Sequence, residues 1–246
     1  MGELINLMNV KPKYYDGPPR NLDTTFGYDY FDGSRERGCG GYTYMPGYWK
    51  PGIENILNRY KLPSTSKVLD IGCAKGFFLA ELLSMCPQME VQGIDISEYA
   101  IANAHESVKP FVSLGSADNL NRYADHSFDL VLGVNCLHFL APERVIVALK
   151  EIVRVGKKNY FVQVDSFHNE VELERMLAWA AYRISIPDSY KDAAVRLQLP
   201  LWAPIIKTIY TPEQWIETFN KAGYDGDCYW TLARPTRMAD VALDCH

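Results

Sequence analysis

The chain lacks the features that would place it in a membrane or in an oxidising compartment. No apolar run reaches the ~18 residues that a membrane-spanning helix needs, and the first residues contain no apolar stretch of the signal-peptide kind. The six cysteines are scattered, without a Cys-x-x-Cys pair, which argues against a disulfide framework and a zinc site. We therefore expect a soluble, cytoplasmic protein with free thiols and no bound metal.

The chain also lacks an excess of basic residues. The 246 residues include 30 acidic and 25 basic side chains, which gives a net charge of −5. Nucleic-acid-binding proteins usually carry a basic excess, and no block of like charges is present here. We therefore expect neither a nucleic acid nor a membrane as a partner. The length and the 48% hydrophobic content favour one domain with a packed core.

The most informative stretch is a strand, a glycine turn and a helix. Residues 68–71 are typical of a short buried strand, Gly72 and Gly76 permit a tight turn, and apolar residues then recur at helical spacing over 77–83. Such a turn lets a ligand approach bare backbone at a helix N-terminus. Asp95 follows 19 positions after Gly76, at the end of the next apolar run, where a carboxylate can accept hydrogen bonds from ribose hydroxyls.

The glycine spacing does not fit a dinucleotide fingerprint. That fingerprint places glycine at its first, third and sixth positions. Counted from Gly72, those positions hold Gly72, Ala74 and Phe77, and Phe77 would block the close packing of helix on strand. A nicotinamide-dependent oxidoreductase is therefore a disfavoured alternative.

The stretch Asp70–Gly76 instead resembles the first motif of class I S-adenosylmethionine-dependent methyltransferases, an acid followed by Gly-x-Gly-x-Gly, with Ala74 at the middle glycine. Further family-like segments follow in order, namely 91–97, 115–120, and 127–132 with the loop 137–140, so that the resemblance covers about half of the chain. It implies a Rossmann-like, doubly wound, mostly parallel α/β sheet. It also implies S-adenosylmethionine as cofactor and S-adenosylhomocysteine as product.

The resemblance assigns roles around the cofactor. Asp70 would orient the ammonium group, although a carboxylate that only caps the turn is the alternative. Asp95 would bind the ribose and Ile96 would pack on adenine, while Ser116 or Asp118 would meet the adenine amino group. The expected cofactor-binding residues are Asp70, Gly72, Cys73, Ala74, Gly76, Asp95, Ile96, Ser116, Ala117, Asp118 and Asn135.

Three side chains are candidates for proton transfer on the acceptor side. His138 follows the fourth strand and could act as a general base, because histidine titrates near neutrality. The alternative for His138 is a buried histidine bonded to backbone. Asp165 and His168 follow the fifth strand and are second candidates.

The flanks resemble a narrower group of bacterial enzymes. The segments 30–35, 38–44, 48–51, 210–215 and 223–227 are similar to methyltransferases associated with capsules and other surface polysaccharides, some of which act on phosphoramidates. This resemblance implies O-methylation of a small, anionic or sugar-like acceptor. A non-catalytic, S-adenosylmethionine-binding partner subunit is the alternative.

Arginines and aromatic residues of the first 50 residues are candidates for binding that acceptor. Arg35 and Arg37 could clamp an anion bidentately, or could be ordinary surface arginines. Tyr42, Tyr44 and Trp49 could form a binding wall, or a stacked aromatic mini-core.

We expect one domain in three parts: an irregular cap over residues 1–50, a cofactor-binding core over 51–168, and acceptor-side elements over 169–246. Strands are expected at 67–71, 91–95, 111–114, 128–133 and 160–164, and the intervening helices predict a doubly wound sheet. Helices are expected at 53–60, 76–86, 97–107, 142–153, 169–182 and 211–222, an insertion at 183–209 that caps the site, and a closing antiparallel strand at 229–232.

Overall fold

A computed structural model describes residues 2–9, 13–14, 25–34, 37–39, 41–173, 181–182, 203–204 and 207–234. Most of the insertion expected at 183–209, and residues 174–180 of the helix expected at 169–182, lie outside these residues. The expected end of that helix is wrong, because Ala181–Tyr182 form a strand. In the described part of the chain, no helix is long and apolar enough to cross a membrane.

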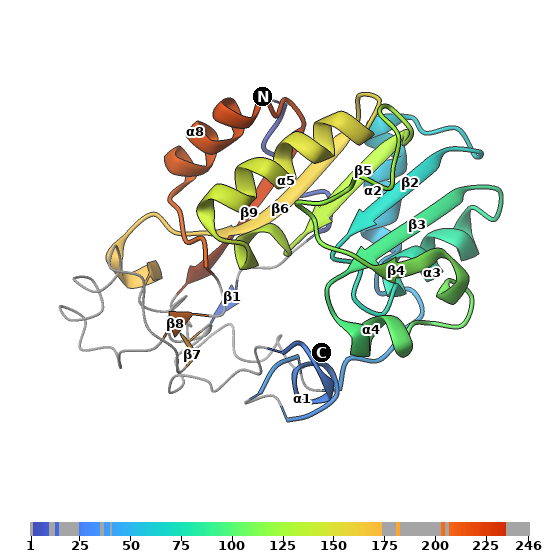
Figure 1. The fold of residues 1–246 in the computed structure, drawn as a ribbon, viewed down its shortest axis with the longest axis horizontal. Coiled ribbons are helices and arrows are strands. Elements are labelled where there is room, and N and C mark those ends of the chain that lie inside the picture. Colours follow the sequence, from blue (N-terminus) through green and yellow to red (C-terminus); the bar gives the residue numbers. More distant parts are fainter. Residues whose placement is uncertain are drawn as a thin grey trace.

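Seven strands form one sheet within the described residues, in the order β1-β9-β6-β5-β2-β3-β4 (Figure 1). Every neighbouring pair in this sheet is parallel. The bounds are β1 Lys13–Tyr14, β2 Lys67–Ile71, β3 Glu90–Asp95, β4 Val112–Leu114, β5 Leu130–Val134, β6 Tyr160–Ser166 and β9 Asp227–Arg234. The predicted doubly wound, mostly parallel fold is confirmed, and the five core strands lie within two residues of their predicted bounds.

Helices cover both faces of the sheet. In Figure 1, α5 (Pro142–Val155) and α8 (Pro212–Ala222) lie on one face, and α2 (Lys50–Tyr60) and α3 (Phe77–Met85) lie on the other. The shorter elements are α1 Tyr28–Phe31, α4 Glu98–Ala102, the 3₁₀ turns η1 Lys109–Phe111 and η2 Leu137–Phe139, and an antiparallel pair of β7 Ala181–Tyr182 with β8 Ala203–Pro204.

Each face has its own hydrophobic core. Because successive side chains of a strand point to opposite faces, Val68 joins the core under α2 and α3, whereas Leu69 joins the core under α5 and α8. Burial of both faces explains why the strands read as continuous apolar runs rather than as an alternating pattern.

The closing strand differs from its prediction. We expected an antiparallel strand at 229–232, and this is wrong, because β9 pairs parallel with β6 from Phe161↔Asp227 to Ser166↔Leu232. The helix α8 lies between the two strands in sequence, and a strand–helix–strand connection returns the chain in the same direction. Thr211 begins α8 with a capping box that involves Gln214.

The helix expected at 97–107 is also shorter than predicted, since α4 ends at Ala102. Its start is as expected: the Ser97 side chain accepts a hydrogen bond from the Ala100 amide. Beyond the end of the helix, the His105 amide donates to the Lys75 carbonyl at 2.9 Å. A tertiary hydrogen bond therefore takes the place of a helical one.

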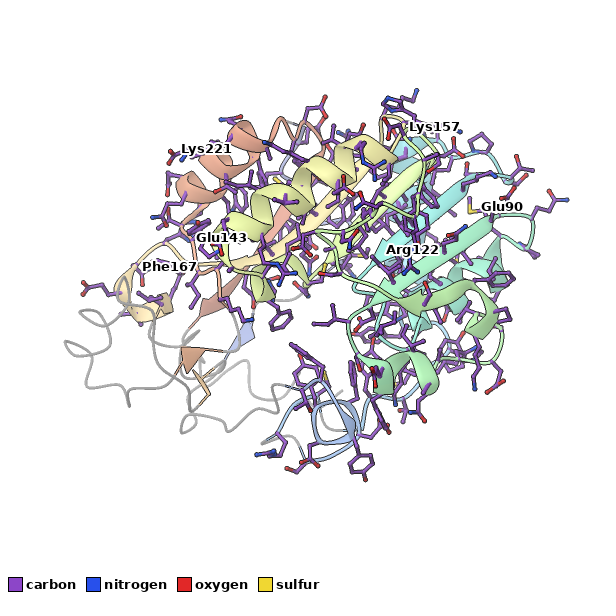
Figure 2. All side chains as sticks on the ribbon, in the orientation of Figure 1. Glu90, Arg122, Glu143, Lys157, Phe167 and Lys221 are labelled. Atoms are coloured by element: carbon purple, nitrogen blue, oxygen red, sulfur yellow. The ribbon has the colours of Figure 1, made fainter. Side chains whose placement is uncertain are left out.

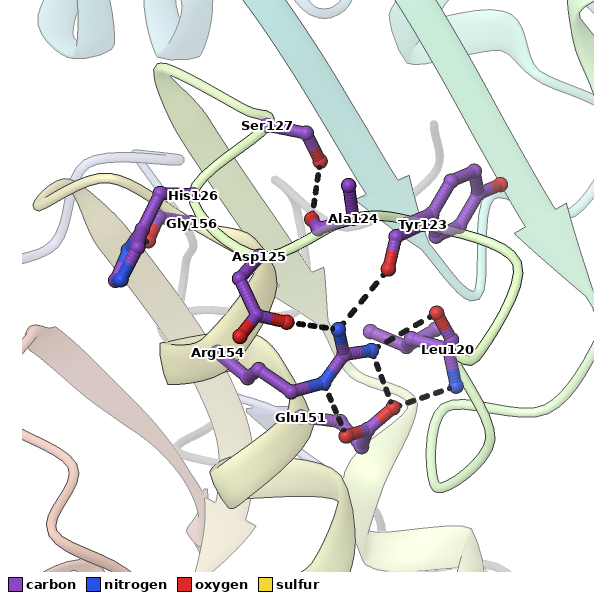
Figure 3. A network of polar contacts seen from close by, with 9 residues as sticks. All are labelled: Leu120, Tyr123, Ala124, Asp125, His126, Ser127, Glu151, Arg154 and Gly156. Atoms are coloured by element: carbon purple, nitrogen blue, oxygen red, sulfur yellow. Dashed lines mark hydrogen bonds and ion pairs between the residues drawn. The ribbon is translucent and has the colours of Figure 1, made fainter.

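One arginine organises the long loop between β4 and β5 (Figure 3). The guanidinium of Arg154, on α5, donates to the Glu151 carboxylate at 2.7 and 2.9 Å and to Asp125 at 2.6 Å. It also donates to the carbonyls of Tyr123 at 2.9 Å and Leu120 at 3.0 Å. All five N–H donors of a guanidinium thus have acceptors, and the loop is tied to α5.

We predict that Arg154→Lys lowers the free energy of unfolding by about 2 kcal/mol, because a lysine point charge replaces a planar fork and leaves partly buried carbonyls without donors. Urea unfolding measures the change. The control is Lys157→Met, which removes an ion pair whose side chains are 48% and 29% exposed and should cost less than about 1 kcal/mol. Equal, small effects of both substitutions would contradict the structural role of Arg154.

Candidate active site

Buried ionisable side chains gather where the parallel strands end. Asp70, Asp95 and Asp165 lie at the carboxyl ends of β2, β3 and β6, and all three are buried. Lys75 and His138 are buried in the turns that follow β2 and β5. Charged residues near the other ends of the strands, such as Glu90 and Lys157, are exposed at the periphery (Figure 2). The carboxyl edge is therefore the candidate site, as in other open α/β sheets.

The turn after β2 is held in an unusual backbone conformation. Gly72, Ala74 and Gly76 have φ values of +73°, +50° and +71°, in the left-handed region that favours glycine. A Cβ atom on Gly72 would lie 2.4 Å from the Cβ of Cys136. The amides of Gly72 and Cys73 donate to the Ile94 carbonyl. Glycine at position 72 is therefore required by the close packing of Cys136, and the Gly72 and Cys73 amides offer a ligand no free N–H.

Asp95 joins this turn to the end of β3. Its carboxylate accepts from the Ala74 amide and from the Ser97 amide, each at 2.8 Å. Burial raises the pKa of Asp95, against the lowering effect of these hydrogen bonds. A carboxylate offers about four lone-pair positions, so the group retains capacity to accept from ribose hydroxyls. The neighbouring Ile96 is 52% exposed, as a residue that packs on a ligand ring would be.

Asp70 has no such support. Its side chain is buried, and within the described residues no donor hydrogen-bonds the carboxylate. Burial, together with the nearby charge of Asp95, raises the pKa of Asp70 from 3.8 to about 8. A buried carboxylate without a donor is unfavourable in its charged form, and a cationic ligand group would relieve that cost. S-adenosylmethionine carries an ammonium and a sulfonium, so the residues present fit this cofactor.

The loop after β4 brings together both candidates for the adenine edge. The Ser116 hydroxyl donates to Asp118, and Arg144 of α5 forms a bidentate ion pair with the same carboxylate. Burial alone would raise the pKa of Asp118, but the hydrogen bonds from Arg144 and Ser116 outweigh it and lower the pKa. Sequence reasoning missed Arg144, because no motif marks it. The two candidates for the adenine edge are thus hydrogen-bonded to each other.

The two histidines of the acceptor side have opposite environments. His138 is 1% exposed, and its Nδ1 accepts from the Asp165 amide at 3.1 Å, while Nε2 lies 3.9 Å from the Asp165 carboxylate. The His168 ring is 48% exposed, with Nδ1 at 3.2 Å from the Glu172 carboxylate. A proton on Nδ1 of His168 would leave Nε2 as a lone-pair acceptor. Sequence reasoning missed Glu172, although its i,i+4 spacing from His168 was a signal.

Asn135 is clamped beside β6. It has φ of +54°, its amide donates to the Gln163 carbonyl at 2.8 Å, and its Oδ1 accepts from the Gln163 side chain at 3.2 Å. A non-glycine residue in this conformation carries strain that surrounding contacts must hold.

The cap residues that were predicted to bind the acceptor mostly contact other residues of the protein. Arg35 lies outside the described residues, and Arg37 pairs with Asp29 at 3.3 Å. The Tyr42 ring stacks on Phe77 with centroids 5.0 Å apart. The other two contacts are also with α3: Tyr44 donates its hydroxyl to Glu81 at 3.1 Å, and Trp49 packs edge-on against Phe78. These contacts favour the aromatic mini-core over an open binding wall.

Comparisons with known proteins agree with this geometry. Residues 68–159 match the family model described as a methyltransferase domain. An uncharacterized methyltransferase of Schizosaccharomyces pombe is 29% identical over 126 residues, which cover 49% of this chain and 48% of that protein. A malonyl-(acyl-carrier protein) O-methyltransferase of Legionella pneumophila is 27% identical over 118 residues, with 47% and 41% covered. The chain thus spans about half the length of the curated relatives it matches.

Among solved structures, a putative methyltransferase from an antibiotic biosynthesis pathway of Anabaena variabilis aligns with a TM-score of 0.47 at 19% identity, over 69% of this chain and 59% of that one. Residues 68–159 are thus similar to methyltransferase domains, and the parallel sheet with its glycine turn agrees with this likeness. The cofactor of that family is S-adenosylmethionine.

We predict that Ala74→Gly raises the free energy of unfolding by about 1 kcal/mol, because glycine adopts a positive φ without the Cβ strain of alanine. Chemical denaturation measures it. Ala80→Gly, inside α3, should lower stability by about 1 kcal/mol or more. A loss of stability in both variants would show that Ala74 is unstrained.

A second prediction concerns pH. If a cationic ligand binds the Asp70 carboxylate, binding releases the proton that the raised pKa retains. The affinity for S-adenosylhomocysteine, which keeps the ammonium, should rise by up to about tenfold per pH unit between 6 and 8, and then level off. In Asp70→Asn, binding should be weaker at pH 8 and nearly independent of pH. Calorimetry in buffers of different ionisation enthalpy measures the proton release.

The stability of the ligand-free protein should respond in the opposite sense. The folded-state pKa of Asp70, about 8, lies above its ordinary value of 3.8. The protonated carboxyl therefore contributes stability that is full below pH 3.8 and is lost as the pH rises to about 8. Asp70→Asn should remove this loss and leave the variant more stable than the wild type at pH 8. A variant that is less stable at pH 8 would contradict the unpaired state of Asp70.

Proposed function

We propose that this chain catalyses methyl transfer from S-adenosylmethionine to an oxygen atom of a small molecule. The observation that carries the proposal is the buried carboxylate of Asp70, which has no donor within the described residues and lies beside the turn of the methyltransferase domain. A cationic ligand group would complete this site.

Different residues would contact different parts of the cofactor. Asp70 would bind the ammonium group, Asp95 the ribose hydroxyls, and the Ser116–Asp118 pair the adenine edge. When bound, S-adenosylmethionine supplies a methyl group activated by a positively charged sulfur, which departs as a neutral thioether. The chain has mainly to align the acceptor in line with that methyl group and to exclude water.

The acceptor is proposed to be a small metabolite of the sugar or phosphoramidate type, in the modification of a bacterial capsule or other surface polysaccharide. Support comes from the resemblance of the flanking segments, and the Legionella relative is itself named an O-methyltransferase. Arg37 adds no support for an anionic acceptor, because it already pairs with Asp29. We retain the core and the acceptor-side elements but confine the cap to residues from 25 onward, because β1 lies in the main sheet. The acceptor is proposed to bind against this cap.

A hydroxyl acceptor would need a base, and we propose His168 for this role. Its ring is half-exposed at the end of β6, and Glu172 orients it through Nδ1. This leaves Nε2 to take the hydroxyl proton as oxygen bonds to the methyl carbon. The Nδ1 of His138 already accepts the Asp165 amide, so we assign His138 to positioning Asp165. An acceptor oxygen that is already ionised would need no base.

We predict that His168→Gln lowers kcat for a hydroxyl acceptor about 100-fold or more, the usual contribution of a general base, and leaves the Kd of S-adenosylhomocysteine unchanged. The assay incubates enzyme and S-adenosylmethionine with panels of sugars, sugar phosphates and phosphoramidates, and measures S-adenosylhomocysteine. The control is His126→Gln, whose ring contacts the Gly156 carbonyl away from the site.

Two other results would change the assignment. Unchanged turnover in His168→Gln with a hydroxyl acceptor would remove His168 as the base. A wild-type protein that binds no S-adenosylhomocysteine, or that binds it and methylates no acceptor of any panel, would contradict the proposed oxygen methyltransferase.

A further inference from the structure

A buried lysine connects the cofactor turn to the cap. Lys75 lies between Ala74 and Gly76 and is 6% exposed. Its ammonium donates to both carboxylate oxygens of Asp32, at 2.7 and 2.6 Å, and to the Tyr42 carbonyl at 3.1 Å. An ammonium has three protons, and all three are used to hold the cap.

Tyr99 belongs to the same cluster. Tyr99, in the first turn of α4, donates its hydroxyl to Asp32 at 2.6 Å, and its ring centroid lies 5.7 Å from the Lys75 ammonium. The Ser97 hydroxyl makes a second tie by donating to the Phe26 carbonyl at 2.6 Å. The cap is thus bonded to the two segments that are expected to hold the methionine and adenosine halves of the cofactor.

The cap also reaches the acceptor side. The Phe26 ring packs edge-on against Phe139 of η2, with centroids 5.4 Å apart. At its other end, Tyr42 stacks on Phe77 of α3. The described part of the cap therefore contacts the elements that follow β2, β3 and β5, and bridges the carboxyl edge of the sheet between them.

Disruption of the Lys75–Asp32 ion pair is expected to be costly. Burial alone would raise the pKa of Asp32, yet hydrogen bonds from Lys75 and Tyr99 hold it below its ordinary value. The Lys75 and Asp32 side chains are 8% and 22% exposed, so the pair is largely shielded from water, and removal of one partner leaves the other charge poorly compensated. An exposed pair such as Lys67–Glu90, with side chains 49% and 65% exposed, is screened by water and contributes little.

We propose that Lys75 is a positioning residue that ties the cap to the cofactor turn, so that the cap closes over bound cofactor and must open before the cofactor leaves. The inference rests on the cofactor site of the proposed function. Breaking the Lys75–Asp32 pair would then accelerate cofactor release, because the cap would open more often, without changing the residues that touch the cofactor.

The test measures S-adenosylhomocysteine dissociation by stopped flow and its Kd by calorimetry. Lys75→Met should raise the dissociation rate and the Kd about tenfold, and amides of 25–34 and 41–44 should exchange faster in the bound protein. Lys67→Met, the matched control, should change either quantity by less than twofold. Asp32→Asn should weaken binding in the same direction, and the double variant Asp32→Asn/Lys75→Met should bind no more than twofold more weakly than Lys75→Met.

Several outcomes would overturn the proposal. A Lys75→Met protein that is less stable but releases S-adenosylhomocysteine at the wild-type rate would show that the cluster is only structural. If Lys75→Met does not fold, Tyr99→Phe decides, because it keeps the ion pair and removes one hydrogen bond: faster release supports the proposal and the wild-type rate refutes it.

If the wild type does not bind S-adenosylhomocysteine, the proposed function fails. Faster amide hydrogen exchange of the cap in ligand-free Lys75→Met would then still show that Lys75 holds the cap to the turn, and unchanged exchange would refute this.

Discussion

The hydrogen bond from the Ala74 amide to the Asp95 carboxylate joins two turns that follow different strands. Parallel pairing of β2 with β3 brings the ends of both strands to one edge, and this bond then fixes the turn after β2 against the turn after β3. The turn carries a non-glycine residue at positive φ, which is unfavourable by itself. The contact with Asp95 therefore holds a strained backbone in place at the end of β2.

The same edge contains buried charges of two kinds. Asp70 lacks a hydrogen-bond donor within the described residues. Its pKa is raised by burial and by the charge of Asp95, and no hydrogen bond from these residues lowers it. Lys75, five residues later, has all its protons bonded to the cap. A site that binds a cation must leave one carboxylate uncompensated. Lys75 does not compensate Asp70, because its ammonium is bonded to Asp32 and to the Tyr42 carbonyl of the cap.

Local pattern was enough for much of the fold. Strand–helix alternation, the glycines of the turn and the 19-residue spacing to Asp95 predicted the sheet and the cofactor edge, because each depends on residues close together in sequence. The direction of β9 was missed, since it depends on what connects it to β6. The pairs Asp118–Arg144 and His168–Glu172 were missed as well, although the second has a helical spacing that is visible in the sequence.

The sequence by itself determined where the glycine turn and its flanking strands lie, because a tight turn requires glycine or a small residue at particular positions and a strand requires apolar ones. Only the tertiary structure decided which charges are compensated. Lys75 and Asp32 are 43 residues apart, and no pattern in the sequence links them. Whether such a charge is solvated, paired or left for a ligand depends on burial and on partners from distant segments, and these exist only once the chain has folded.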